Sequence, residues 1–192
     1  MRLILASTSP HRAQILRDHN IEFVACPSNV EEKITPRTTP AAAAIELGKQ
    51  KCLAVYESGQ YNEDVVIGAD TIVVSASGEL LSKPRDAEQA ADYMQQRSGA
   101  VENVITGFWI CHKNGSLGGC EMTRITYSEI PATVQQQIIA SNEWQGVCGG
   151  LKVEGSIAPY VKNIEGEYEN IRGLPIKRLG PIIRSLLTSI ST

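Results

Sequence analysis

The sequence predicts an α/β fold in one folding unit, and two observations support this. Short apolar runs typical of buried strands alternate along the chain with longer segments in which apolar residues recur at helical spacing. The chain has 192 residues, of which 42% are apolar, and this is enough to bury a substantial core as one α/β domain or as two tightly joined lobes. We therefore expect one folding unit over residues 1–192.

The N-terminal segment predicts a strand, a polar turn and a helix. Residues 3–6 form an apolar run that suits a buried strand. Ser9 can cap the helix that follows, and Pro10 suits the first helical position, where its missing N–H is not needed. Residues 21–25 are expected to form a second strand.

The next elements lead to an acidic residue inside an apolar run. An Ala-rich helix is expected from Thr39-Pro40 to about Ser58-Gly59. Residues 65–69 form a β-branched run typical of a buried strand, and residues 71–74 continue extended. Asp70 therefore interrupts an otherwise apolar segment.

The C-terminal half predicts further helices and strands. Asp86 is placed to cap a helix that ends near Arg97. The remaining expected elements, in chain order, are a strand at 103–111, turns at Asn114-Gly115 and Gly118-Gly119, a strand at 124–128, a helix from Pro131 to about Ala140, a strand at 158–164 and a helix at 175–187.

Charge and composition exclude several classes of protein. The net charge of −3 argues against binding to a nucleic-acid backbone, which usually needs a basic face. The chain has no apolar run of the roughly 18 residues that a membrane span needs. Its five cysteines form no CxxC pair, which favours reduced thiols over a disulfide framework or a zinc site. We expect a cytoplasmic protein without nucleic-acid or membrane partners.

Two groups of residues suggest chemistry on an anionic ligand. Ser7 and Arg12 flank the start of the first helix, where free backbone N–H groups attract phosphate, although ordinary N-capping is the simpler explanation for the serines. Asp70 could bind Mg²⁺ or take a proton from water at the end of its strand, or it could be a turn or cap residue. Glu31-Glu32 offers a second acidic group, or a solvated loop.

Further cations and a glycine cluster could complete such a site. Lys51 and Lys83 could neutralise a triphosphate, although lysines are commonly just solvated. Glycines between Gly149 and Gly155 allow backbone to approach a ligand, and Glu154 adds a carboxylate that accepts hydrogen bonds, although a glycine-rich surface turn is the simpler explanation.

The order of these segments resembles the Maf family of nucleoside triphosphate pyrophosphatases over nearly the whole chain. The segments that carry the resemblance are residues 5–12, 31–32, Lys51, 68–71, 83–84, 98–99, 106–107, 149–155, Gly166 and 173–175. The resemblance implies an elongated mixed sheet flanked by helices, in a single domain of two lobes with a central cleft (Maf/Ham-like, anticodon-binding-like). It also implies metal-dependent hydrolysis of nucleoside triphosphates to monophosphate and pyrophosphate, in a homodimer.

The resemblance also assigns roles to residues of this chain. It makes Asp70 the proton acceptor, and Asp70 and Glu32 the ligands of a divalent cation such as Mg²⁺, Mn²⁺ or Co²⁺. The residues that it implies for substrate binding are Ser7, His11, Arg12, Lys51, Thr71, Lys83 and Glu154. Glu102 and Asn103 depart from the family, which commonly has a His-Glu pair at these positions.

The base preference is divided between two branches of the family. The dTTP/UTP branch typically has Arg, Thr and Gln at the positions of His11, Thr71 and Glu154, whereas the 7-methyl-GTP branch has Trp, Gln and Glu. Thr71 thus favours pyrimidines. Glu154 favours a guanine-type base, because a carboxylate can accept from the adjacent N1–H and N2–H₂ donors.

Two other functions stay open. One is an inosine or xanthosine triphosphate pyrophosphatase, which shares the reaction but recognises another base. The other is a non-enzymatic nucleotide-binding regulator of cell division, which would bind nucleotides without turnover.

Overall fold

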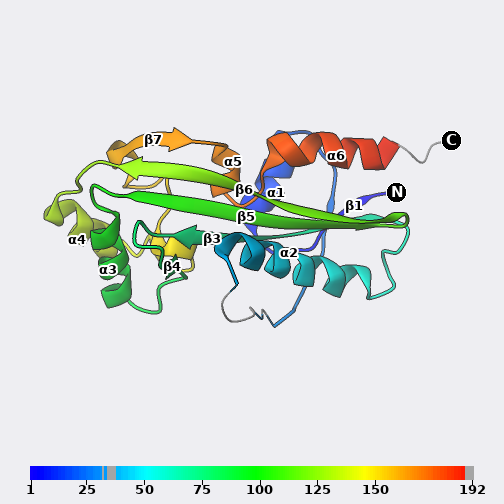
Figure 1. Ribbon diagram of the computed structural model, residues 1–192, viewed down its shortest axis with the longest axis horizontal. Coiled ribbons are helices and arrows are strands. Elements are labelled where there is room, and N and C mark those ends of the chain that lie inside the picture. Colours follow the sequence, from blue (N-terminus) through cyan, green and yellow to red (C-terminus); the bar gives the residue numbers. More distant parts are fainter. Residues whose placement is uncertain (32, 34–37, 189–192) are drawn as a thin grey trace. The chain divides into compact units, whose positions relative to one another are not determined.

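The computed structural model describes residues 1–31, 33 and 38–188 and confirms the predicted α/β class (Figure 1). Within this part of the chain, helices flank a mixed seven-stranded sheet with strand order β2-β1-β3-β5-β6-β7, and β4 pairs with β3. The chain divides into two compact units. Unit 1 comprises residues 1–70, residues 106–121 and the described chain from Arg172 onward, and unit 2 comprises residues 71–105 and 122–171.

The elements are distributed between these units as follows. Unit 1 holds β1 (Leu3–Leu5), α1 (Pro10–Asp18), β2 (Val24–Ala25), α2 (Pro40–Tyr56) and α6 (Ile176–Thr188). Unit 2 holds β4 (Leu80–Leu81), α3 (Ala87–Arg97), α4 (Ala132–Ala140), the 3₁₀ turns η1 (Cys148–Gly150) and η2 (Ala158–Tyr160), β7 (Val161–Glu165) and α5 (Tyr168–Ile171). Residues of β3 (Val65–Val74), β5 (Val101–His112) and β6 (Gly115–Tyr127) belong to both units.

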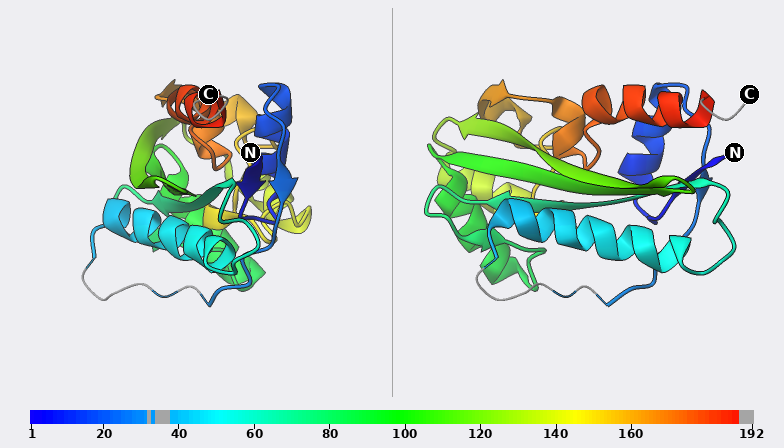
Figure 2. Two further views of the ribbon diagram at one scale, coloured as in Figure 1. Left: turned by 90° about the vertical axis from the view of Figure 1, so that its right-hand side faces the viewer. Right: turned by 45° about the vertical axis from the view of Figure 1, so that its right-hand side comes forward.

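In unit 1 the strands separate two apolar layers, because successive side chains of a strand point to opposite faces. Leu3 and Leu5 of β1 pack with α1 and α6, whereas Ile4 and Ala6 pack with α2. Figures 1 and 2 show α1 and α6 on one face of these strands and α2 on the other. β1 pairs in parallel with β3, with Leu5 opposite Ile67.

Unit 2 has its own apolar core. Tyr93 and Met94 of α3 pack in one cluster with Ile125 of β6 and Ile138 of α4. None of the helices in the described part of the chain is long and apolar enough to cross a membrane.

The predicted N-caps Ser9 and Asp86 are confirmed, and Thr39 caps α2 in the same way. Each cap side chain accepts the backbone N–H of the residue three positions later, at 3.4 Å for Ser9, 3.3 Å for Thr39 and 2.8 Å for Asp86. Pro10 and Pro40 are the first residues of α1 and α2, as their lack of an N–H donor favours.

The prediction for the glycines after the β5–β6 turn was wrong. β6 begins at Gly115, so Gly118 and Gly119 lie within a long strand rather than in a turn. A Cβ at Gly118 would overlap the ring of Trp109, and one at Gly119 would lie 3.0 Å from Phe108 Cζ. These glycines therefore make room for large side chains of the neighbouring strand.

Two predicted strands begin later than expected. The N–H of Ile21 donates to Leu16 O at 2.9 Å, so this residue still closes the end of α1, and β2 starts at Val24. Residues 158–160 form η2 around Pro159, which has no N–H to donate to a neighbouring strand, and β7 starts at Val161.

Candidate active site

Asp70 lies on a strand that does not end there. β3 continues through ten residues, so the prediction that a strand end presents Asp70 was wrong. The alternation of the strand places Asp70 on the same face as Val66 and Gly68, which is the face that α2 covers. Asp70 and Thr71 are half-buried, whereas the other residues of β3 are buried.

Glycines bring α2 unusually close to this strand. A Cβ at Gly68 would overlap backbone atoms of Gly48 and Cys52 in α2, and a Cβ at Gly107 in β5 would overlap the backbone of Ala44. The Cys52 thiol donates to Val66 O at 3.2 Å. The helix backbone therefore packs directly on the strand backbones, which fixes the position of the side chains next to the contact.

Lys51 and Asp70 form an ion pair beside this contact. The Lys51 ammonium donates to Asp70 Oδ1, and the two side chains are 12% and 14% exposed. Such partial burial strengthens the attraction between the charges relative to a surface pair, because less water screens it. The structure thus brings two of the predicted site residues together.

Ser7 and Arg12 form a second pair in unit 1. Arg12 Nη1 donates to Ser7 Oγ at 3.2 Å, and Arg12 Nε donates to Gly173 O at 2.8 Å. Ser7 also accepts the N–H of Ser9 at 3.1 Å. The guanidinium is therefore held at the N-terminus of α1, where backbone dipoles favour an anion. The carbonyl of Gly173 is a contact that the sequence did not predict.

The remaining predicted site residues before Asp70 are His11 and Glu32. His11 is exposed on the first turn of α1. Glu32, the second predicted metal ligand, lies outside the described residues. In the described part of the chain, no group of three or more His, Cys, Asp or Glu side chains is arranged to hold a metal ion.

In unit 2 the η1 turn contacts the segments of Thr71 and Lys83, and Glu154 follows this turn in the chain. Cys148 Sγ donates to Thr71 O at 3.4 Å. The side chains of Lys83 and Glu154 are exposed, and the Tyr168 hydroxyl donates to Glu154 Oε2 at 3.4 Å. Lys83 follows β4, and Glu154 follows η1 by four residues.

A buried charge network next to these segments was not predicted. Arg97 Nε donates to Glu102 Oε2 at 2.9 Å, and the Tyr127 hydroxyl donates to Glu102 Oε1 at 2.6 Å. Burial and the Glu102 carboxylate raise the pKa of the Tyr127 hydroxyl, so it donates as a neutral phenol. No local pattern predicts this pairing, because Arg97 ends one element and Glu102 lies in the next.

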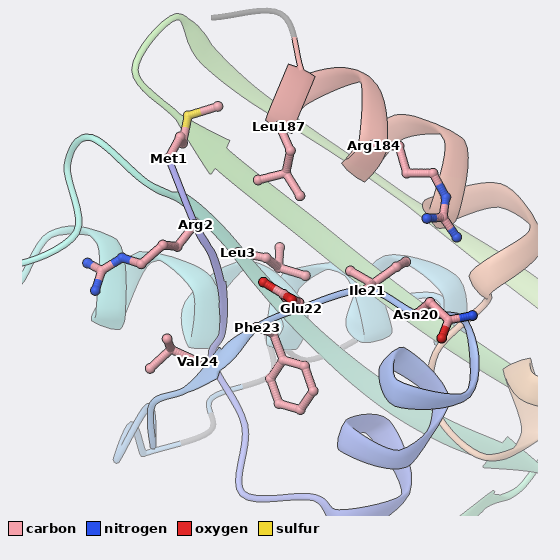
Figure 3. Close-up of a pocket in the computed structure, with 10 residues that line it drawn as sticks. All are labelled: Met1, Arg2, Leu3, Asn20, Ile21, Glu22, Phe23, Val24, Arg184 and Leu187. Atoms are coloured by element: carbon pink, nitrogen blue, oxygen red, sulfur yellow. The ribbon is translucent and has the colours of Figure 1, made fainter. Parts of the chain in front are cut away.

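A pocket of about 320 Å³ lies elsewhere in unit 1 (Figure 3). Side chains from β1, β2, the preceding loop and α6 line it, among them Arg2, Glu22, Phe23 and Arg184. The predicted site residues are not among its lining residues.

The fold and the paired charges define an α/β protein whose carboxylate, lysine and helix N-terminus suit a phosphorylated ligand. The family described as Maf-like protein matches residues 2–186, and the chain belongs to this family. This confirms the resemblance noted in the sequence.

The chain is also similar to individual members of curated families. It is 34% identical to the dTTP/UTP pyrophosphatase of Pyrococcus abyssi over 95% of each chain. It is 38% identical to the dTTP/UTP pyrophosphatase of Koribacter versatilis over 96% of this chain and 94% of the relative. Among solved structures, a nucleoside-triphosphatase / dITP/XTP pyrophosphatase from Mycobacterium abscessus aligns with a TM-score of 0.48 at 15% identity, covering 100% of this chain and 98% of that one.

Proposed function

We propose that the chain is a nucleoside triphosphate pyrophosphatase that releases nucleoside monophosphate and pyrophosphate. The observation that carries the proposal is the half-buried Lys51–Asp70 pair, which glycine packing holds on the strand β3. The relatives named dTTP/UTP pyrophosphatase align over nearly their whole length, which supports the same reaction for this chain.

Asp70 is the group that takes the proton of the attacking water. A carboxylate within reach of a water can serve as a general base, and water attack on the α-phosphorus would break the α–β bond. Lys51 has three N–H donors, so it can orient Asp70 and donate to a phosphate oxygen at the same time. Negative charge that develops on pyrophosphate is stabilised by such fixed donors.

Ser7, Arg12 and the N-terminus of α1 bind the phosphate chain in this proposal. The Arg12 guanidinium is already oriented by Ser7 and Gly173, so little side-chain entropy is lost when a phosphate binds. The family resemblance also implies Lys83 for substrate binding, and its side chain is exposed on unit 2.

A divalent cation fits the oxygen donors of this site. Mg²⁺ and Mn²⁺ prefer carboxylate and phosphate oxygens, and Mg²⁺ is commonly held by one or two carboxylates together with substrate phosphates. Asp70, with Glu32 as the second ligand that the resemblance implies, would hold such an ion. When bound, such a cation would supply positive charge that neutralises the phosphates of the substrate.

We propose dTTP and UTP as the preferred substrates. The Tyr168 hydroxyl donates to Oε2 of Glu154 at 3.4 Å, and an ionised carboxylate has about four acceptor positions, so Glu154 can accept from the single N3–H of uracil or thymine as well as from guanine. Thr71 agrees with this choice, because the dTTP/UTP branch of the family carries Thr at this position. The relatives from Pyrococcus abyssi and Koribacter versatilis support the same bases.

One experiment separates the candidate functions. Pyrophosphate release is measured from dTTP, UTP, GTP, 7-methyl-GTP and ITP with Mg²⁺, Mn²⁺ and Co²⁺, for the wild type and for Asp70→Asn. We expect equal amounts of monophosphate and pyrophosphate, loss of activity with EDTA, and at least about a hundredfold loss of turnover in a folded Asp70→Asn variant. Orthophosphate as the first product, or near-normal turnover by Asp70→Asn, would refute the mechanism.

The same panel tests the alternatives. A clean-up enzyme would prefer ITP, a guanine-type enzyme GTP or 7-methyl-GTP, and a regulator would bind without turnover. A homodimer, which the family resemblance implies, is a further part of the proposal, and light scattering after size exclusion tests it.

A further inference from the structure

The buried ion pair of unit 2 fixes the orientation of one guanidinium. Arg97 ends α3, and both Nε and Nη2 of its guanidinium approach Glu102 Oε2, at 2.9 and 2.8 Å. The side chains of Arg97 and Glu102 are 2% and 6% exposed. Because Tyr127 holds the other carboxylate oxygen, Glu102 cannot rotate without losing a contact.

The guanidinium also holds a backbone carbonyl. Arg97 Nη2 donates to Gly149 O at 2.9 Å. Gly149 has a φ of +68° and Gly150 a φ of +66°, a left-handed conformation that glycine adopts without strain. A Cβ at Gly149 would lie 3.2 Å from Arg97 Nη2, so glycine also permits the close approach. Arg97 therefore fixes the η1 turn at its first left-handed residue.

This turn packs on the residues that flank Lys83. The N–H of Gly149 donates to Ser82 O at 3.0 Å. A Cβ at Gly150 would lie 2.6 Å from Pro84 Cγ, which shows how closely the turn approaches the next residue. The position of Lys83 is thus coupled to the turn on both sides.

The same turn precedes Glu154 and contacts Thr71. Gly150 is followed within four residues by Glu154, and the Cys148 thiol donates to Thr71 O at 3.4 Å. The candidate substrate residues of unit 2 therefore share one support, and Arg97 is the charged side chain that holds it.

Stability alone does not account for this pair. Removing two charges from water is costly, and well-packed apolar side chains in place of a buried ion pair are often equally stable or more so. Arg97 Nη1 adds to the cost, because it is buried without a hydrogen-bond partner in the described part of the chain. The pair supplies a hydrogen-bond donor that is aimed at the Gly149 carbonyl, which apolar residues could not do.

We infer that Arg97 and Glu102 are positioning residues for substrate binding, which fix the η1 turn and through it Lys83 and Glu154. The inference rests on the proposed function and adds to it the residues that set the geometry of the substrate contacts in unit 2. Arg97 touches no reacting atom in this account, and Glu102 acts only through Arg97.

The test compares two single variants with a matched control. Arg97→Lys keeps the charge but loses the planar fork, and Glu102→Gln keeps the shape but loses the charge that orients Arg97. Arg178→Lys is the control, because Arg178 also donates to a carboxylate and a backbone carbonyl, at 2.7 Å to Glu121 and 3.0 Å to Cys120 O. That pair is about half-exposed and belongs to unit 1.

The measurements are kcat and KM for UTP, dTTP and GTP, and the Kd of an α,β-methylene analogue of UTP. For Arg97→Lys and Glu102→Gln we expect KM and the analogue Kd to rise at least about tenfold, with kcat changed less than about threefold and a changed ratio of UTP to GTP turnover. Arg178→Lys should leave all of these values unchanged. A parallel fall of kcat for all nucleotides at unchanged KM would mean a structural role and overturn the inference.

A third variant separates positioning from folding. Arg97→Met, Glu102→Leu and Tyr127→Phe together replace the network by apolar side chains of similar size, which can preserve stability. We expect this protein to melt within a few degrees of the wild type and still to show a raised KM and analogue Kd. A stable triple variant with wild-type KM would overturn the inference. Wild-type protein that releases no pyrophosphate would instead refute the proposed function, and analogue binding would still test the turn.

Discussion

Replacing Gly68 by Ala is expected to push α2 away from β3 and so to separate Lys51 from Asp70. The added Cβ would overlap the Gly48 carbonyl and the Cys52 N–H, and it would lie 2.9 Å from Cys52 Cα, where ordinary contacts begin at 3.4 Å. Because these are backbone atoms, a rotamer change cannot relieve the clash, and the helix must move away from β3.

The expected losses of stability and of turnover follow from this displacement of α2. Adding a methyl group to a well-packed contact costs about 1–3 kcal/mol, which lowers the melting temperature of a chain of this size by roughly 2–12 °C. Lys51 is the residue before Cys52, so the same shift moves its ammonium relative to Asp70. A displacement of about 1 Å between catalytic groups costs about a hundredfold in rate.

The assay is pyrophosphate release at saturating substrate, with the melting temperature measured in parallel. Gly180→Ala is the matched control, because its Cβ would meet only Ile176 Cγ1, at 3.9 Å, inside α6. Because Gly180 precedes Pro181, whose ring disfavours the helical conformation of a preceding residue with a Cβ, this change should cost some stability and leave turnover unchanged. If Gly68→Ala matched the wild type in both measurements, the close packing of α2 would not be what holds the Lys51–Asp70 pair.

Three further predictions concern charged residues. Lys51→Gln removes the positive charge beside Asp70 and should lower kcat at least about tenfold, measured by pyrophosphate release, whereas an unchanged kcat would remove Lys51 from the site. The hydrogen bond from Arg2 lowers the pKa of Asp64 below its ordinary value of 3.8, so in acid the unfolded state binds more protons than the folded state. The stability that the pair contributes is therefore complete above this value and is lost as the pH falls through the lower folded pKa. Asp64→Asn should flatten the acid dependence of the free energy of unfolding in denaturant titrations, and an unaltered dependence would contradict the prediction. Glu154→Gln should raise the ratio of UTP to GTP kcat/KM by about ten to a hundredfold, and the same ratio in both proteins would exclude Glu154 from base recognition.

Local signals in the sequence predicted much of the fold. Ser9, Thr39 and Asp86 cap helices where their side chains can reach the third N–H of each helix, a property that depends on a few consecutive residues. The length of β6 was not predicted because glycine is typical of turns, and Gly118 is explained only by the ring of Trp109 that packs against it. That information lies in the pairing of two strands, not in either segment.

The candidate site shows the same limit. Asp70 stands out because a carboxylate interrupts an apolar run, and the sequence alone was enough to find it. The role of Gly68 could not be predicted, because a glycine is required there only by the close approach of the α2 backbone, which comes earlier in the chain. The pair of Arg97 and Glu102 depends likewise on how α3 ends against β5, and charged residues at such positions are usually solvated.

The path of the chain through unit 1 has a consequence for its synthesis. The apolar layer that covers Leu3 and Leu5 includes Leu179 and Ile183 of α6, so β1 packs against a helix that is synthesised much later than the strand itself. All residues of unit 2 lie between positions 71 and 171 and can emerge before that helix does. A nascent chain therefore carries Lys51 and Asp70 long before the apolar layer beneath β3 is complete, and a polypeptide truncated before α6 would lack part of the layer that supports this strand.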